Sequence, residues 1–310
     1  QYYSVYLHSG VGTRLFAEIL RRLGANVYEF GPSDKFIAID TEAISAETLR
    51  SISAMANKII MPDGAAMTAV LSTDGDSDRP LMLGLNQKKK KKTLDFIPGD
   101  IAGAFVAKQL GAQAVAVPIS ANDVVDTYRE GVDVSKTRIG SPYIVVEMDN
   151  LAKTRPEAKI VGWEANGGLL VGVKMAHRQG TLEALPTRDC VLPMVEILVA
   201  AKEKGQSVSS LFDPLRSRSG KADLIDNFPV ATSQAMVARF SLAGAGVARA
   251  VFGKGDQVTV IAENGKDLDG DQRAAVVDRA TLSRSELETY FNADSGFGKI
   301  DWIDFTDGIR

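Results

Sequence analysis

The sequence predicts an α/β fold of consecutive three-layer α/β/α domains with mixed, largely parallel sheets, followed by a truncated α+β domain. Short apolar runs bounded by turn residues, as at residues 69–71 and 114–117, predict strands buried on both faces. Between such runs apolar residues recur at helical spacing, and strands that alternate with helices are typical of layered α/β domains. The first predicted helix carries its apolar residues at Leu15, Phe16, Ile19, Leu20 and Leu23.

Composition and charge are those of an ordinary globular protein. Of the 310 residues 45% are hydrophobic and 24% charged, and the length suffices for two or three domains. A net charge of −3 gives no reason to expect nucleic acid or an anionic membrane as a partner. No apolar run approaches the roughly 20 residues of a membrane-spanning helix. The single cysteine, Cys190, excludes an internal disulfide, suits a cytoplasmic location, and has apolar neighbours that predict a buried thiol.

The predicted elements divide the chain into three domains, at residues 1–97, 98–222 and 223–310. The second begins with a helix that opens at Gly99, and the third is marked by a change in the pattern of elements. Both ends of the chain fall within expected strands. Because domains seldom begin or end inside a sheet, we expect this sequence to be a piece of a longer protein.

A Gly-x-Gly turn, Gly10 to Gly12, joins the expected strand at 2–7 to the helix that begins at Thr13. The dinucleotide-binding fingerprint requires a third glycine and an acidic partner further on, and both are missing. The turn is therefore not predicted to bind a nucleotide, and His8 is interpreted as a turn residue.

Two charged stretches are interpreted as solvated loops. Lys88–Lys92 stands between expected hairpin strands at 81–84 and 96–97, and flexible lysines without backbone donors make a poor specific phosphate site. An acidic triplet at residues 267–271 lies among Asn and Gly residues, which is typical of a turn. Neither stretch is assigned a function.

The loop Asp74-Gly75-Asp76-Ser77-Asp78-Arg79 directly follows the expected strand at 67–73. Three carboxylates at alternate positions of one tight turn repel one another unless a cation lies among them. Ligands that are all oxygens favour a hard cation such as Mg²⁺. Open α/β sheets bind their ligands at strand ends, which favours a site over a solvated acidic turn or a helix N-cap.

Two other interpretations of this loop can be compared with the sequence. An EF-hand that began at Asp74 would need Gly at its sixth position and Glu at its twelfth, where the chain has Arg79 and Leu85. The EF-hand is therefore excluded. A phosphatase of the haloacid dehalogenase type also carries Asp-x-Asp after a strand, with the first Asp as nucleophile, so Asp74 in that role stays an open alternative.

A second polar loop, Trp163-Glu164-Ala165-Asn166-Gly167-Gly168, follows the expected strand at 159–162. The two glycines let the backbone approach a ligand closely. Glu164 supplies acceptors and Asn166 a donor and an acceptor, which suits paired hydroxyl groups. A plain turn with Asn in a left-handed conformation is the alternative that these residues alone leave open.

The first loop resembles the metal-binding loop of the α-D-phosphohexomutases, whose usual form is Asp-Gly-Asp-Gly-Asp-Arg. Ser77 stands where that form has its second Gly. The resemblance implies that Asp74, Asp76 and Asp78 hold Mg²⁺ against a phosphoserine and that Arg79 stands beside the phosphate.

The second loop resembles the sugar-binding loop of the same family, of the form Gly-Glu-x-Ser-Gly followed by His or Gly. The resemblance implies that Glu164 contacts hydroxyl groups of the sugar ring, with Asn166 at the place of the Ser and Gly167 at that of the following Gly. Arg138 falls where the family has a basic residue near the reacting hydroxyl. Arginine binds phosphate well but is a poor proton acceptor, so Lys136 is the alternative for that role.

The resemblance covers about residues 1–225, with Asp189 as the Asp that precedes a helix. It implies reversible phosphoryl transfer between O1 and O6 of a hexose phosphate, as in phosphomannomutase or phosphoglucomutase, through a hexose bisphosphate. The family's phosphoserine loop and last phosphate-binding loop have no counterpart in this sequence. A non-catalytic sugar-phosphate or metal-binding module that keeps the two loops stays open as an alternative.

Overall fold

The computed structural model describes residues 1–62, 65–86, 93–127, 131–216, 220, 227–253, 257–262, 268, 270–290, 300 and 302–305. The chain forms two compact units, Gln1–Leu224 and Ile225–Arg310, each described here by itself. The lysine run at 88–92 and the acidic side chains of the 267–271 triplet lie outside the described residues, so the interpretation of both as solvated loops stays a prediction.

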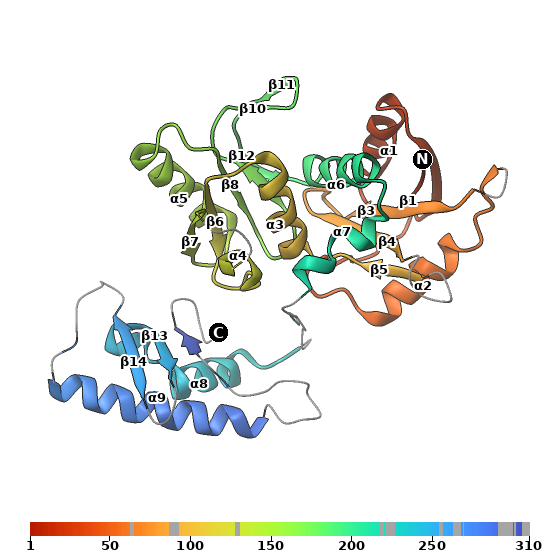
Figure 1. Ribbon diagram of the computed structural model, residues 1–310. Helices are drawn as coiled ribbons and strands as arrows, with labels where there is room; N and C mark the ends of the chain where they lie inside the picture. Colours follow the sequence, from red (N-terminus) through yellow and green to blue (C-terminus); the bar gives the residue numbers. More distant parts are fainter. Residues whose placement is uncertain are drawn as a thin grey trace. The chain divides into compact units, whose positions relative to one another are not determined.

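The first sheet of unit 1 has five strands in the order β2-β1-β3-β4-β5 (Figure 1). Their bounds are β1 (Tyr2–His8), β2 (Asn26–Pro32), β3 (Met67–Thr73), β4 (Pro80–Asn86) and β5 (Thr93–Phe96). β1 runs parallel to β2 and β3, whereas β4 is antiparallel to β3 and β5. The sheet is mixed, as the sequence predicts.

Helices cover both faces of this sheet, which gives three layers. They are α1 (Thr13–Arg22) and α2 (Ala46–Ala56). Because neighbouring residues of a strand point to opposite faces, Leu71 of β3 packs in the same core as Phe16 of α1, whereas Val70 packs with Ile52 of α2. The alternation places apolar residues on both sides of β3, as expected for a central strand.

The second sheet of unit 1 has the order β12-β9-β8-β6-β7. Its strands are β6 (Ala114–Pro118), β7 (Asp133–Thr137), β8 (Ile160–Trp163), β9 (Leu169–Val171) and β12 (Leu185–Asp189). β6 runs parallel to β7 and β8, and β9 is antiparallel to both β8 and β12. A separate hairpin is formed by β10 (Met175–His177) and β11 (Gly180–Leu182).

Helices on both faces of the second sheet complete another set of three layers. They are α3 (Gly99–Leu110), α4 (Val124–Thr127) and α5 (Ser141–Thr154). α6 (Val191–Lys204) follows the last strand of this sheet and packs on β4 of the first sheet. On one face Ile144 of α5 packs on Ala116 of β6, and on the other Phe105 of α3 shares a core with Val115. α3 and α6 pack against each other, and their core continues into that of the first sheet.

A short helix that follows α6 in the chain packs on the first sheet. α7 (Val208–Leu211) packs on β4 so closely that a Cβ on Gly84 would lie 2.6 Å from the backbone nitrogen of Ser209. The hydroxyl group of Ser209 donates a hydrogen bond of 2.9 Å to Asp95 of β5. The residues of both sheets thus fold as one compact unit.

Unit 2 is a small α+β unit with an antiparallel sheet in the order β14-β13-β15. Its elements are α8 (Val230–Phe240), β13 (Val247–Phe252), β14 (Val258–Ala262), α9 (Gly270–Tyr290) and β15 (Trp302–Asp304). Arg249 of β13 pairs with the buried Asp304 of β15 at 2.9 Å.

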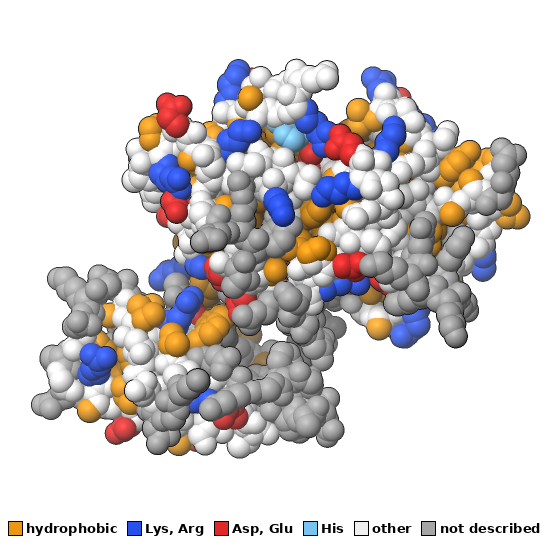
Figure 2. Space-filling view, in the orientation of Figure 1, with side chains coloured by type: hydrophobic (Ala, Val, Ile, Leu, Met, Phe, Trp, Pro, Cys, Tyr) orange, Lys and Arg blue, Asp and Glu red, His pale blue; other side chains and the backbone are white. Residues whose placement is uncertain are grey.

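The surface carries charges of both signs. On the face of unit 1 in Figure 2, Lys and Arg side chains are scattered among acidic and apolar ones, and no field of one sign dominates that face. Among the helices that the structure describes, none combines the length and the apolar character needed to cross a bilayer.

Candidate active site

The acidic loop (Asp74–Arg79) connects β3 to β4 and is closed by the pairing of those two strands. Thr73 pairs with Pro80, and the N–H group of Asp74 donates to the carbonyl group of Arg79 at 3.1 Å. Ser77 has a φ of +65°, the left-handed conformation that Gly adopts most easily. This explains why the usual form of the loop has Gly at that place.

The three carboxylates of the acidic loop converge. One oxygen from each of Asp74, Asp76 and Asp78 can be chosen so that all lie within 4.8 Å of one another. Asp74 is 5% exposed, and its Oδ1 accepts hydrogen bonds of 3.2 Å from the N–H groups of Asp78 and Arg79. Burial raises the pKa of Asp74 to about 6, with further contributions from a hydrogen bond that protonated Asp74 donates to Asp76 and from the negative charges of Asp76 and Asp78.

This donor set fits a hard divalent cation. All three ligands offer oxygen, and burial together with the charges of Asp76 and Asp78 raises the pKa of Asp74, so the loop gains from a cation among the three carboxylates. The buried Oδ1 atom of Asp78 has no hydrogen-bond partner among the described residues. A cation among the three side chains would occupy that oxygen and relieve the repulsion.

Arg79 lies back over the acidic loop. Its Nε atom is 3.5 Å from Asp74 Oδ2 and 3.7 Å from Asp78 Oδ1, and its side chain is 33% exposed. These are ion-pair distances, since Nε makes no hydrogen bond among the described residues. Arg79 is therefore beside the carboxylates and half-open to solvent, where it can exchange these contacts for a bound anion.

The Glu164 loop (Trp163–Gly168) connects β8 to β9 through a tight turn. The N–H group of Gly167 donates to the carbonyl group of Glu164 at 2.9 Å, and Gly167 has a φ of +92°. Glu164 and Asn166 are both buried at 6% exposure. The amide oxygen of Asn166 accepts a hydrogen bond of 3.1 Å from the N–H group of Gly168, so this side chain holds the turn in shape.

The two loops lie side by side. A Cβ on Gly167 would meet Pro80, which ends the acidic loop, at 2.9 Å. A Cβ on Gly99, at the start of α3, would lie 2.3 Å from the backbone nitrogen of Gly167. Cys190, which directly precedes α6, also contacts the acidic loop, because its Sγ atom donates to the carbonyl group of Ser77 at 3.1 Å. Cys190 is buried, as predicted.

Arg188 of β12 joins the two loops directly. Its Nη2 atom lies 2.5 Å from Asp78 Oδ2, and its Nη1 atom donates to Glu164 Oε2 at 2.9 Å. Burial alone would lower the pKa of Arg188, but the hydrogen bond to Glu164 and the two acidic charges raise it. Arg188 is therefore a fixed cation between the loops.

Sequence reasoning missed Arg188. It noted Thr187-Arg188-Asp189 only for Asp189, whose carboxylate accepts from the N–H groups of Val191 and Leu192 at the start of α6. The available signal was a basic residue directly before that Asp. Its two partners are 110 and 24 residues away in the chain, which no local pattern shows.

Lys136 and Arg138 are not joined to the two loops. Lys136 of β7 pairs with Asp126 of α4 at 3.3 Å, and Arg138 is exposed after the end of β7. Among the described residues, no hydrogen bond or ion pair links either side chain to the acidic loop or to the Glu164 loop. Their roles at the reacting hydroxyl stay predictions.

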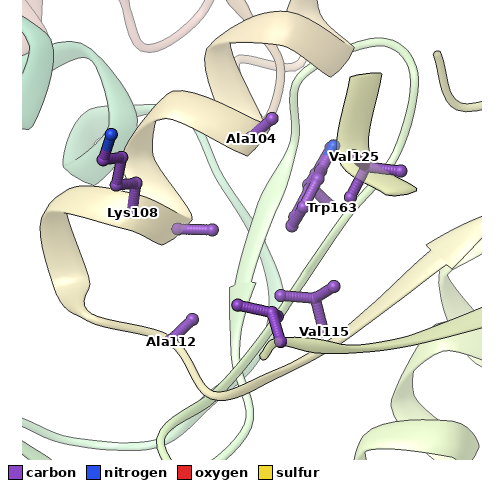
Figure 3. Close-up of a pocket in the computed structure, with 8 residues that line it drawn as sticks. Ala104, Lys108, Ala112, Val115, Val125 and Trp163 are labelled. Atoms are coloured by element: carbon purple, nitrogen blue, oxygen red, sulfur yellow. The ribbon is translucent and has the colours of Figure 1, made fainter. Parts of the chain in front are cut away.

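A small cavity lies between α3 and Trp163, which ends β8 (Figure 3). Apart from Lys108, the side chains that line it are apolar. Without a carboxylate or hydroxyl group in the lining that the structure describes, this cavity offers no chemistry for phosphoryl transfer. The candidate site is therefore the pair of loops and not the cavity.

Sequence comparison with known proteins gives matches over about three quarters of the chain. Residues 98–218 match the model of phosphoglucomutase/phosphomannomutase, alpha/beta/alpha domain III. A phosphomannomutase of Sinorhizobium fredii is 37% identical over 234 residues, which are 76% of this chain and 46% of that protein. A phosphomannomutase of Salmonella muenchen is 34% identical over 233 residues, which are 75% of this chain and 45% of that protein. The chain thus spans about half the length of these curated relatives.

The fold of the chain is also found among solved structures. A phosphoglucomutase/phosphomannomutase family protein from Burkholderia thailandensis superposes with a TM-score of 0.50 at 14% identity. The match covers 68% of this chain and 42% of that one. This likeness shows the fold alone, whereas the assignment to a family depends on the sequence matches. The sequence matches, together with the two loops, show that the chain belongs to the α-D-phosphohexomutase superfamily.

Proposed function

We propose that this chain is the central part of a phosphohexomutase, an isomerase that moves a phosphoryl group reversibly between O1 and O6 of mannose or glucose phosphate. The observation that carries the proposal is the link, through Arg188, between the acidic loop and the Glu164 loop. A mutase needs a centre for phosphoryl transfer beside a site that holds one sugar in two orientations. Two phosphomannomutases among the relatives support this assignment.

In this proposal the chain corresponds to the family's second domain at 1–97, its third at 98–222 and part of its fourth at 223–310. The phosphoryl carrier is then a phosphoserine outside these 310 residues. A hexose bisphosphate is the intermediate, and the enzyme acts in the cytoplasm.

The acidic loop would provide the charge stabilisation for transfer. Asp74, Asp76 and Asp78 would hold Mg²⁺, which offsets negative charge on the phosphoryl group. Arg79, half-open and only loosely paired, would turn towards the phosphate oxygens.

The Glu164 loop would hold the sugar. Glu164 has a buried carboxylate whose Oε2 atom accepts from Arg188, and carboxylate oxygens can accept further hydrogen bonds from ring hydroxyls. Contacts to hydroxyls that both orientations of the sugar share suit a mutase. Asn166 would fix the turn and offer its amide N–H group, and Gly167 would let the backbone approach the ligand. Lys136 is proposed as proton acceptor near the reacting hydroxyl and Arg138 as a phosphate ligand.

The test is an isomerase assay with the complete protein, mannose 1-phosphate or glucose 1-phosphate, and a trace of the bisphosphate. We expect formation of the 6-phosphate to depend on Mg²⁺ and to fall by about tenfold to a hundredfold or more in Asp76→Ala, since loss even of a residue that only supports a metal ligand costs about that much. Asp149→Ala, which removes an exposed carboxylate on α5, is the matched control and should keep wild-type activity. Isomerisation that survives Asp76→Ala unchanged would refute the proposed role of the loop.

A further inference from the structure

The side chain of Arg188 contacts both loops. Its guanidinium group shares its two Nη atoms between Asp78, on the loop after β3, and Glu164, on the loop after β8. The side chains of the three residues are 22%, 26% and 8% exposed. The pair of contacts is thus largely shielded from solvent, where charge interactions are stronger than on the surface.

The aliphatic part of the Arg188 side chain is also closely packed. A Cβ on Gly168 would lie 2.8 Å from Cγ and Cδ of Arg188, so the stem crosses directly over the backbone of the Glu164 loop. Gly168 leaves just the room that this crossing needs. Arg188 is therefore built into the site and cannot be a loosely tethered surface residue.

The local charges make Arg188 a competitor of a metal cation. The carboxylates of the acidic loop and of Glu164 face two guanidinium groups, those of Arg79 and Arg188, and negative charge remains in excess. Asp78 is one of the three oxygen donors and is also the partner of Arg188. A metal cation and the guanidinium group of Arg188 therefore compete for the carboxylate of Asp78.

We infer that Arg188 is a positioning residue that couples cation binding to sugar-phosphate binding, and this inference rests on the proposed function. A cation at Asp78 weakens the Asp78–Arg188 pair and frees guanidinium N–H groups for oxygens of the substrate, while Glu164 keeps the group in place. A bound sugar phosphate draws Arg188 from Asp78 and so leaves that carboxylate to the cation. The coupling is reciprocal, and each ligand strengthens binding of the other.

The test measures both affinities and their linkage in the complete protein. Free Mn²⁺ is followed by electron paramagnetic resonance during titration, with and without saturating mannose 6-phosphate. In the wild type we expect the sugar phosphate to tighten Mn²⁺ binding about fivefold or more, the lower range of measured couplings. In Arg188→Gln, loss of a competing positive charge beside Asp78 should tighten Mn²⁺ binding alone by about tenfold.

The same variant should bind the sugar phosphate more weakly, and the linkage should vanish. Arg188→Lys keeps the charge but cannot bridge two carboxylates with a planar fork, so it should retain the weak Mn²⁺ binding and lose most of the linkage. Arg178→Gln is the matched control, because Arg178 also bridges two carboxylates, those of Glu196 and Glu203. It should leave Mn²⁺ binding and the linkage unchanged.

The outcomes separate this inference from the proposed function. A wild type that binds neither Mn²⁺ nor mannose 6-phosphate refutes both. Suppose that the wild type shows the linkage. If Arg188→Gln then keeps the linkage, or if Arg188→Gln binds Mn²⁺ more weakly than the wild type does, the coupling role is wrong while the mutase assignment stands. If Arg188→Gln fails to fold by circular dichroism, Arg188→Lys decides, since unchanged linkage in that variant refutes the role.

Discussion

The hydroxyl oxygen of Ser77 accepts a hydrogen bond of 2.8 Å from the backbone N–H group of Gly12, which directly precedes α1. A second contact of 2.9 Å joins the same oxygen to the hydroxyl group of Thr73. Ser77 thus ties the acidic loop to the first turn of the fold, although its φ of +65° is unfavourable for a residue with a side chain. These hydrogen bonds offset the backbone strain.

Ser77 allows a test of that balance. Ser77→Ala keeps the strained backbone and loses both hydrogen bonds, so we expect it to lower the free energy of unfolding by about 1–3 kcal/mol. Ser77→Gly loses the same bonds but relieves about 1 kcal/mol of strain, so it should be the milder change. Urea unfolding of the two variants measures the difference. Equal destabilisation would show that the backbone at Ser77 stores no strain.

Local patterns in the sequence predict the two loops well, because each loop follows a strand and takes its shape from its own residues. Asp74 and Glu164 lie at strand ends, as predicted, and the mixed layered fold is confirmed. The approach of the loops was not predictable, since it depends on Gly99 packing on Gly167 and on Arg188 reaching from β12. Such contacts arise only once both sheets are folded.

Gly99 should affect the site without being part of it. A Cβ there would lie 2.3 Å from the backbone nitrogen of Gly167, and backbone cannot yield as a side-chain end can. We expect Gly99→Ala to displace the Glu164 loop, raise KM for the sugar phosphate and cost about 1–3 kcal/mol of stability. Gly180→Ala in β11 is the control, because nothing lies within 4 Å of its Cβ. Wild-type KM in Gly99→Ala would mean that the loop adapts freely.

Glu164→Gln tests the sugar contact with little change in shape. The amide of the introduced Gln cannot form the ion pair with Arg188. It also offers ring hydroxyls a neutral acceptor in place of a charged one. Charge-assisted hydrogen bonds contribute about 1.5–3 kcal/mol, so turnover should fall roughly tenfold to a hundredfold. Steady-state kinetics with both hexose phosphates measures the loss. Unchanged kinetics with both would remove Glu164 from the sugar site.

Cys190 predicts a pH dependence of stability. Burial, with the charge of Asp189 next, raises the pKa of this thiol from 9.0 to about 12. The unfolded chain therefore releases the proton near pH 9 while the folded chain keeps it, so stability falls as the pH rises above 9. Between pH 8 and 10 the wild type should lose about 1.4 kcal/mol more than Cys190→Ala. Parallel pH profiles of the two proteins would show that the thiol ionises in the fold.

The role of Asp74 separates a mutase from a hydrolase of the haloacid dehalogenase type. In the mutase Asp74 is a cation ligand, and the phosphoryl acceptor is a serine outside these 310 residues. In the hydrolase Asp74 is itself phosphorylated. The structure favours the first role, because Asp74 is 5% exposed and one of its oxygens already accepts two backbone N–H groups, so its carboxylate has little access to the phosphorus atom of a substrate.

Incubated with mannose 1-phosphate and Mg²⁺, residues 1–310 alone should therefore release neither inorganic phosphate nor an isomer. Asp74→Asn keeps the shape of the side chain and removes its nucleophilic charge. Phosphate release by the wild-type chain that disappears in Asp74→Asn would establish the hydrolase and overturn the mutase.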